Sequence, residues 1–400
     1  MRSFVLNAIA FTLVHGIAVP LQQIRTVHQV QSANVVFNPP AGDIDSVVVP
    51  CAKEESIDVN VSTSALGCSS ERPERQRNVH KVIQHRHKLN ISQPDDSNMH
   101  EEFPCMCPNA EEFLPCICDC CSEPGGVIDC SQISDVNQLK IKFQTTEFPI
   151  KKYTKFQSRN TDTSSINSIE DIPCLPENVF NDVSFKKIYM TFGVFKHVHP
   201  EAFMSSVETL EELSMTCSYY LTLFPELVEF PYLNKLELSS NAIELLPVVA
   251  PQPSLIRLLL DYNKINQVMP YAFANLPSLQ VLDLAVNRLT ALEENTMHLT
   301  SDTPSIYMDS NRISYIDDKA FSGTELVNQP GFLDITNNNL TTLKEPVFRK
   351  ILETVSSLML DEGGVNVNKN PLDCNSLTWL TNDEELKPYL YVPQCPSINS

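Results

Sequence analysis

Residues 279–289 read LQVLDLAVNRL, and two neighbouring stretches repeat their pattern: LNKLELSSNAI at 233–243 and LIRLLLDYNKI at 255–265. Each stretch has leucine or isoleucine at its first, fourth, sixth and eleventh positions and asparagine at its ninth. This is the extracellular leucine-rich-repeat signature, L-x-x-L-x-L-x-x-N-x-L. The alternating apolar residues of a short strand point to one side, so they enter a common core. The stretches therefore predict a curved parallel sheet built from stacked coils.

Further copies extend the pattern in both directions. Three weaker copies follow, two degenerate copies precede around Ile188 and Leu213, and a turn near Phe156 is a candidate for another. Successive anchors are 25, 23, 22, 24, 24, 27 and 32 residues apart, so the last two steps contain insertions. A side-chain amide at the turn after each strand can satisfy backbone groups of two coils. We therefore predict a buried asparagine ladder: Asn241, Asn263, Asn287, Asn311, Asn338 and Asn370.

A second marker lies on the return path of three coils, where Phe203, Phe273 and Phe321 each follow an alanine. An aromatic stripe could bind a ligand, but a spacing tied to the repeat favours packing inside the convex side. One repeat cannot bury its own apolar face, so the stack needs a lid at each end. Cysteine clusters occupy both ends of the array. Such clusters form either disulfides or zinc sites, and the export signal described next favours disulfides.

The N-terminus carries the features of a secretory signal. Arg2 provides a positive start, Phe4–Ile17 is largely apolar, and small residues precede a predicted cleavage after Ala18. Thirteen cysteines in an exported chain indicate an oxidising compartment. No later segment is apolar enough to span a bilayer, so we expect a secreted, extracellular protein without a membrane anchor. Three tripeptides are glycosylation acceptors: Asn60, Asn90 and Asn339.

These features divide the chain into five parts and place it in the α/β class, as a leucine-rich-repeat solenoid with disulfide-bonded caps. The part between the signal and the first cap is polar, without usable periodicity, and we interpret it as a flexible leader of unknown role. The predicted parts are a signal peptide at 1–18, the leader at 19–104, an N-terminal cap at 105–131, repeats at 132–373 and a C-terminal cap at 374–400.

The charge distribution excludes some partners. The net charge is −20, and residues 101–400 account for all of it, with twenty basic and forty acidic residues. This part should repel nucleic acid and anionic membranes. The chain has no Gly-x-Ser-x-Gly, no His-Glu-x-x-His and no glycine-rich phosphate loop. We therefore expect no enzymatic activity, no metal site and no cofactor.

From Cys107 to Cys395 the chain resembles a secreted arthropod leucine-rich-repeat family, named after the non-catalytic subunit of oplophorus-luciferin 2-monooxygenase. The sequence motifs that carry the resemblance include CPNAE at 107–111, PCIC at 115–118 and NPLDC at 370–374. The spacing of the four cap cysteines leaves three pairings open. The resemblance implies the pairs Cys107–Cys118 and Cys116–Cys130, and a protein partner rather than catalysis.

The chain departs from this family at the C-terminal cap. Ser376 stands where the family usually has a second cysteine, and only Cys395 follows, which leaves Cys374 and Cys395 as one pair. An odd number of cysteines remains without an assigned partner, so at least one of them either stays a free thiol or forms a disulfide with another molecule. The unplaced residues are Cys51, Cys68, Cys105, Cys120, Cys121, Cys174 and Cys217.

The residues between the buried leucines point away from the core, and they make up the concave face of such a solenoid. Acidic residues recur there on five successive coils, beside apolar residues of the kind that protein interfaces use as anchors. The acidic residues either bind a partner or only keep the protein soluble. The candidate binding residues are Glu237, Arg257, Leu259, Asp261, Asp283, Tyr307, Asp309, Phe332 and Asp334.

Two functional classes remain open from the sequence. The first is a secreted protein that binds or stabilises a partner protein through its concave face. The second is an extracellular-matrix or innate-immune recognition module that binds glycans or microbial surfaces. No sequence feature identifies the partner.

Overall fold

The computed structural model describes residues 105–133, 135–159, 172–302, 304–321, 331–358 and 364–395, and the backbone of one short hairpin. That hairpin pairs β1 (Phe11–Val14) antiparallel with β2 (Ile17–Pro20), within a unit that spans residues 1–50. The repeats lie in a second unit, residues 51–400. The rest of the predicted signal, the leader and the tripeptides at Asn60 and Asn90 lie outside the described residues.

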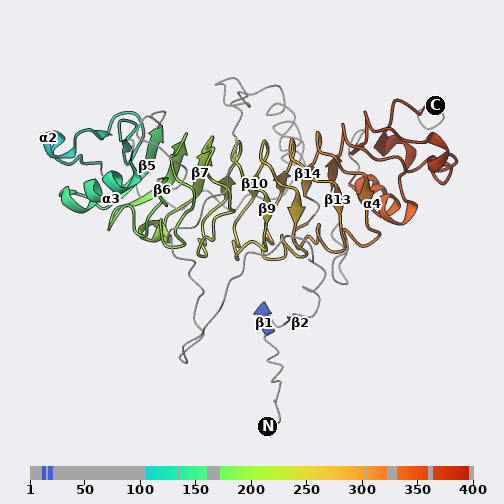
Figure 1. Cartoon of the computed structure of the whole chain (residues 1–400), viewed down its shortest axis with the longest axis horizontal. Helices are drawn as coiled ribbons and strands as arrows, with labels where there is room; N and C mark the ends of the chain where they lie inside the picture. The colour runs from blue at the N-terminus through green and yellow to red at the C-terminus, as the bar shows by residue number, and fades with distance from the viewer. Residues whose placement is uncertain are drawn as a thin grey trace, which may run out of the picture. The chain divides into compact units, whose positions relative to one another are not determined.

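One large sheet runs through the described part of the second unit (Figure 1), and each coil contributes one strand to it. Neighbouring strands are parallel from β4 onward, whereas β3 is antiparallel to β4. Its twelve strands are β3 (Ile117–Asp119), β4 (Val127–Asp129), β5 (Lys152–Arg159), β6 (Ser184–Thr191), β7 (Glu212–Thr216), β8 (Lys235–Glu237), β10 (Arg257–Leu259), β12 (Val281–Asp283), β14 (Ser305–Tyr307), β16 (Phe332–Asp334), β17 (Val365–Asn366) and β18 (Leu390–Tyr391).

The register of this sheet lines up one apolar residue from every coil. Each member of the row is at most 2% exposed, so the row forms the spine of the core. Because Phe156 belongs to it, the candidate copy near that residue is a true coil. The row consists of Ile128, Phe156, Ile188, Leu213, Leu236, Leu258, Leu282, Ile306, Leu333, Val365 and Leu390. The chain is thus a leucine-rich-repeat solenoid with a curved parallel sheet.

Short elements return the chain on the convex side. They are η3 (Met204–Ser206), the pair β9 (Leu245–Leu246) and β11 (Gln267–Val268), and the pair β13 (Ala291–Leu292) and β15 (Tyr315–Ile316). The rings of Phe203, Phe273 and Phe321 are buried there and belong to the main core. They pack inside the convex side, as the spacing predicts.

The longest step between anchors contains a helix, α4 (Glu345–Ser357). Its second residue is Pro346, which fits the first turn because no backbone donor is needed there. Apolar residues three and four apart form its buried side, and they extend the core beneath the last strands: Val347, Phe348, Ile351, Leu352 and Val355. The other insertion, residues 322–330, lies outside the described residues.

The N-terminal cap closes the core with aromatic rings. It contains α2 (Ala110–Phe113), and α3 (Val136–Thr145) follows it directly. The ring of Phe143 is fully buried and contacts five other rings, with centroids 5.0–6.1 Å away. Those rings belong to Phe113, Phe148, Phe156, Phe180 and Phe185.

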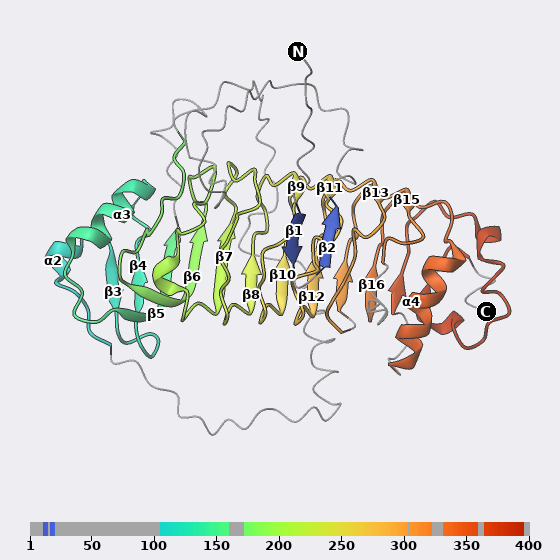
Figure 2. The same ribbon diagram turned by 90° about the horizontal axis from the view of Figure 1, so that it is seen from below.

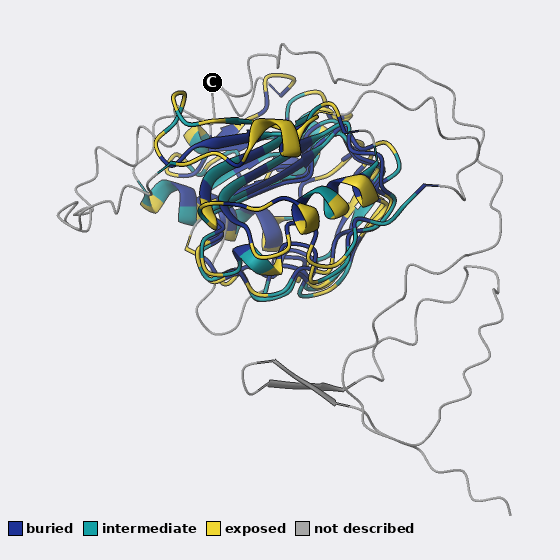
Figure 3. Ribbon diagram, turned by 90° about the vertical axis from the view of Figure 1, so that its left-hand side faces the viewer, coloured by how far each residue is buried: buried dark blue, intermediate teal, exposed yellow. Residues whose placement is uncertain are grey.

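The view in Figure 3 shows buried residues at the centre of the stacked coils and exposed residues on the outer helices.

The C-terminal cap contains η4 (Cys374–Leu377) and η5 (Lys387–Tyr389). The indole of Trp379 donates to the carbonyl of Leu343 at 3.2 Å, and the Arg349 guanidinium lies 5.4 Å from the Trp379 ring centre. Arg349 also pairs with Asp383 at 2.9 Å, which joins α4 to the cap. Figure 2 shows α3 and α4 at opposite ends of the sheet.

Four disulfides join described cysteines. Cys107 is bonded to Cys118 and Cys116 to Cys130, which are the pairings implied by the family resemblance, and Cys374 is bonded to Cys395. The fourth bond, Cys105–Cys120, uses two cysteines that the sequence left unplaced. Cys174 and Cys217 are each disulfide-bonded as well. Among the described residues the free thiol is Cys121, which is exposed.

Candidate functional site on the concave face

Six asparagines form a continuous ladder behind the strands, and each is at most 8% exposed. The amide oxygen of Asn287 accepts from the Ile265 N–H at 2.9 Å, one coil earlier. Its amide nitrogen donates to the carbonyls of Leu260 and Leu284, at 2.9 and 3.1 Å. The same bonds recur at the other rungs: Asn241, Asn263, Asn311, Asn338 and Asn370. The ladder fixes the spacing of the coils and therefore the positions of the side chains on the concave face.

The strand register defines two rows of residues on the concave face, and a third row directly follows the strands. The first row runs Lys155, Lys187, Glu212, Lys235, Arg257, Val281, Ser305 and Phe332. The second runs Gln157, Tyr189, Ser214, Glu237, Leu259, Asp283, Tyr307, Asp334 and Asn366. Two of the predicted acidic residues, Asp261 and Asp309, follow their strands and belong to the third. The predicted acidic residues thus occupy two rows rather than one column.

In the N-terminal half of the face, charges are paired with one another. Lys187 lies 3.2 Å from a carboxylate oxygen of Glu212, and the hydroxyl of Tyr189 donates to that carboxylate at 2.8 Å. On the next coil, Lys235 lies 2.8 Å from Glu237, a candidate residue that is only 5% exposed. Lys187, Tyr189 and Lys235 were not among the candidate residues predicted from the sequence. The coil of Lys187 and Tyr189 lacks the marker asparagine, whereas Lys235 lies in the complete repeat at 233–243.

This pairing perturbs both titrating partners. Burial raises the pKa of Glu212, but hydrogen bonds from Tyr189 and Lys187 outweigh it and hold that pKa below its usual value. Burial, followed by the hydrogen bond to Glu212, raises the pKa of Tyr189. The Tyr189 hydroxyl therefore stays protonated and donates a hydrogen bond to an ionised carboxylate.

We expect Tyr189→Phe to destabilise the fold by about 1 kcal/mol at pH 7, allowing for partial solvent screening of a bond to a charged group. Because the pKa of Glu212 is lower in the folded than in the unfolded protein, its ionised carboxylate stabilises the fold at any pH above the pKa of the unfolded state. This contribution is lost as the pH falls through the pKa of the folded state. The penalty of the variant should therefore shrink between pH 5 and pH 2. Urea titrations at neutral and at acidic pH measure this loss in the free energy of unfolding. The control is Tyr391→Phe, at an exposed tyrosine. A penalty independent of pH would contradict the assignment.

The C-terminal half of the face carries an apolar cluster that is separate from the main core. Val281, Ala285 and Tyr307 are its buried members, and the half-buried Leu259 and Phe332 pack against them. The rings of Tyr307 and Phe332 have centroids 5.4 Å apart. These residues come from four adjacent coils, so the stacking of the repeats brings them together.

Some carboxylates around this cluster have structural roles. Asp283 accepts from the N–H of Ala285 at 3.0 Å, and Asp334 accepts from the N–H of Thr336 at 2.9 Å. Each closes the turn at the end of its own strand, as asparagine and aspartate side chains often do. Asp261 accepts a short hydrogen bond of 2.5 Å from the hydroxyl of Ser239. The acidic pattern that suggested a binding site in the sequence therefore arises partly from turn geometry.

Two groups of described residues bring metal-ligating atoms within 4.8 Å of one another. The first consists of Cys105, Cys107 and Cys120, whose sulfurs are all in disulfides and therefore offer no thiolates. The second consists of Glu177, His199 and Glu201 on two neighbouring coils. Nδ1 of His199 already accepts from the backbone N–H of Glu201 at 3.2 Å. Neither group arises from a ligand motif in the sequence.

Comparisons with known proteins agree with the fold. Residues 253–313 match the family described as Leucine rich repeat. The oplophorus-luciferin 2-monooxygenase non-catalytic subunit of Oplophorus gracilirostris is 28% identical over 311 residues, which cover 70% of this chain and 80% of that protein. Osteomodulin of Bos taurus is 22% identical over 233 residues, or 56% and 52% of the two chains.

A solved structure, the crystal structure of the TLR13-ssRNA13 complex, resembles the fold with a TM-score of 0.46 and 19% identity. The similar region covers 66% of this chain and 35% of the TLR13 chain. The similarity to the luciferase subunit, a named non-catalytic component, supports the relationship inferred from the sequence, although it does not establish an arthropod origin. Among the described residues, no helix has the length and apolar character needed to cross a bilayer.

Proposed function

We propose that this chain is a secreted, non-enzymatic protein that binds a partner protein through the C-terminal half of its concave face. The observation that carries the proposal is the apolar cluster on the strand side, apart from the main core, in which the partly exposed Leu259 and Phe332 pack on the buried Val281 and Tyr307. A leucine-rich-repeat core needs no such cluster, because its leucines already pack on the other side of the sheet. Aromatic and aliphatic anchors beside charged residues are typical of protein interfaces.

Several features support secretion and an accessory role. The predicted signal at 1–18 and the disulfides in both caps fit an oxidising extracellular space. Asn339 is exposed between two buried neighbours, so its side chain is accessible for glycosylation. The similar shrimp protein is named a non-catalytic subunit, which supports a partner rather than a catalytic site here.

The charges around the cluster suggest the chemistry of the partner. The partly exposed Asp261, Asp283 and Asp334 lie on the same coils as the cluster, and Arg257 lies at its edge. A surface with apolar side chains flanked by lysine or arginine would complement this arrangement. Such a partner would associate faster at low salt, because opposite charges steer encounter.

A double substitution tests the proposal. We expect Leu259→Glu with Phe332→Glu to abolish capture of the partner from native extracellular fluid, because two carboxylates cannot be buried against its apolar anchors. Wild-type full-length protein should retain the same partner. The matched control is Leu245→Glu with Val248→Glu, two exposed apolar residues away from the concave face. Equal capture by both double variants, read by quantitative mass spectrometry, would place the binding site elsewhere.

The similarity to osteomodulin supports a second candidate function, that of an extracellular-matrix or innate-immune recognition module that binds glycans or microbial surfaces. Retention of the full-length protein on isolated matrix, cuticle or bacterial cells, in the absence of other soluble proteins, would favour this function over the first.

A further inference from the structure

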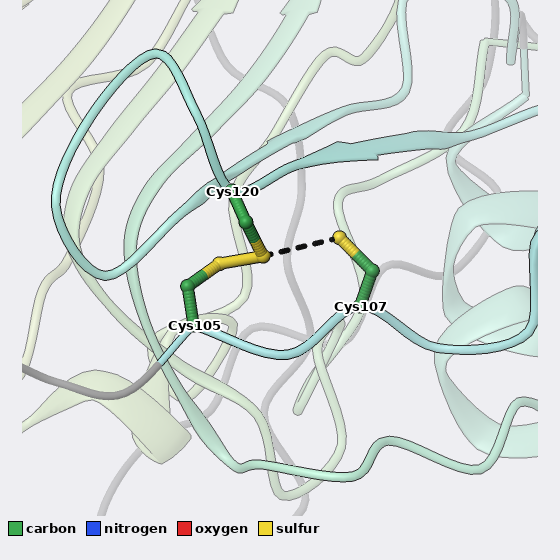
Figure 4. A group of neighbouring side chains, drawn as sticks. All are labelled: Cys105, Cys107 and Cys120. Carbon is green, nitrogen blue, oxygen red and sulfur yellow. Dashed lines mark hydrogen bonds between the residues drawn. A yellow bond between two sulfur atoms is a disulfide. The ribbon is translucent and has the colours of Figure 1, made fainter.

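Two disulfides of the N-terminal cap lie against each other. Cys105 is bonded to Cys120, Cys107 is bonded to Cys118, and the Sγ atoms of Cys107 and Cys120 are 3.4 Å apart. Neither of these sulfurs carries a hydrogen, so this is a non-bonded contact between two disulfides. Figure 4 shows the sulfurs of Cys105, Cys120 and Cys107 in a row, with Cys120 in the middle.

The local fold holds this row in place. Cys118 lies in β3, and Cys120 directly follows the end of that strand, so the two cysteines are only two residues apart; the same spacing relates Cys105 to Cys107. The hydroxyl of Tyr153, whose ring is buried, donates to the carbonyl of Met106 at 2.8 Å and ties down the segment between those two cysteines.

A glycine makes room for the end of the row. A Cβ atom built on Gly126 would lie 2.3 Å from Sγ of Cys105, which is closer than real atoms approach, and this residue has φ of +81°. The sulfur of Cys105 therefore occupies space that only glycine leaves open.

We propose that these two disulfides form a thiol-exchange site, at which an external thiol becomes bound to the cap and rearranges its disulfides without any net change in oxidation state. Thiolates attack disulfide sulfur through a mixed disulfide, and the attacking, central and leaving sulfurs must lie in line. The 3.4 Å contact brings Sγ of Cys107 within reach of Sγ of Cys120, so Cys107 can be the attacking sulfur, Cys120 the central sulfur and Cys105 the leaving sulfur.

The exchange has two steps. A small thiolate attacks Sγ of Cys118, forms a mixed disulfide there and releases Cys107 as a thiolate. The Cys107 thiolate then attacks Sγ of Cys120, forms the Cys107–Cys120 bond and releases Cys105 as a thiolate. One disulfide is exchanged for another in each step, and the electron pair leaves with the departing sulfur. The product carries a thiol at Cys105 and the bound small thiol at Cys118.

Accessibility distinguishes this pair of bonds from the third disulfide of the N-terminal cap. Cys107 is exposed, and its three neighbours in the pair of disulfides are partly exposed. By contrast, Cys116 and Cys130 are 2% and 0% exposed and belong to the main core. The Cys116–Cys130 bond should therefore keep the cap attached while the outer bonds rearrange.

The sharpest test is Cys118→Ser in the full-length chain, because it leaves Cys107 as a permanent thiol. The exchange replaces one disulfide within the chain by another, so it needs no added oxidant. Peptide mapping after an acid quench should therefore find the Cys107–Cys120 bond and an alkylated Cys105 in a readily measured share of molecules. Cys121→Ser should be added in a parallel sample, to show that the free thiol is not the attacking group.

The matched control is Cys130→Ser, which frees the buried Cys116 and should produce no new bond. A second experiment uses wild-type protein and needs no substitution. Treatment with a limited amount of reduced glutathione should attach glutathione to Cys118 and form the Cys107–Cys120 bond, while the Cys116–Cys130 bond stays intact. The proposal is overturned if Cys105–Cys120 persists in every molecule of the Cys118→Ser variant and the glutathione-treated wild type also yields no Cys107–Cys120 bond.

Discussion

Replacing Asn287 with alanine should lower the free energy of unfolding by about 3 kcal/mol, one of the largest effects expected from a single polar residue in this chain. Its amide oxygen is the acceptor for the Ile265 N–H in the middle of the ladder. Because the site is 7% exposed, water cannot easily replace the lost acceptor. An orphaned buried donor costs about 1 to 3 kcal/mol, and the small cavity left by the side chain adds to it.

The two carbonyl groups that accept from the amide nitrogen of Asn287 lose less hydrogen bonding in this variant. Leu260 keeps a hydrogen bond from Asn263, and Leu284 keeps one from Asn311, because neighbouring rungs share their acceptors. The penalty should therefore come mainly from one N–H group, and hydrogen exchange should be fastest at Ile265 in the variant. Urea titration of the full-length chain measures the total loss.

The control for this substitution is Arg288→Ala, one residue along the chain. Arg288 is exposed, so its replacement should change stability by less than about 0.5 kcal/mol. Asn295 lies outside the ladder but is a poor control, because it has φ of 61°, a conformation that alanine adopts only at a cost. Equal losses for Asn287→Ala and Arg288→Ala would show that the ladder does not carry the stability assigned to it.

The sequence predicted the ladder because its residues repeat at a fixed distance from the apolar anchors. The same periodicity placed the strands and the buried phenylalanines of the convex side. It did not reveal Lys187 or Tyr189, whose coil has Gly193 in place of the marker asparagine, nor their contacts with Glu212 on the next coil. Regular spacing is a local property of the chain, whereas this network depends on which coils lie next to each other.

The concave face shows a second limit of sequence reasoning. Asp283 and Asp334 recur at one repeat position, which could indicate either a binding surface or a structural demand. Their bonds to the backbone two residues later show a structural demand that needs no ligand. The apolar cluster of Leu259, Tyr307 and Phe332 carries more weight for function, because no feature of the repeat requires it. The sequence supplied these residues as candidates, but their contact across four coils required three-dimensional structure.

The phenylalanine cluster of the N-terminal cap gives the largest effect expected from an apolar substitution. Phe143→Ala should destabilise the protein by about 3 to 5 kcal/mol, because it leaves a cavity at the centre of five contacting rings. In a solenoid each coil contacts mainly its neighbours, so the damage should begin at the capped end and spread along the stack.

Hydrogen exchange distinguishes this local damage from global unfolding. In the Phe143→Ala variant, amides of β5 and β6 should lose protection at denaturant concentrations where those of β12 and β14 keep it. Tyr219→Phe, at a ring that is 53% exposed, is the matched control and should leave both regions unchanged. If all strands lose protection together, the coils unfold as one cooperative unit, and the cap then stabilises the concave face at its far end as well as the first repeats.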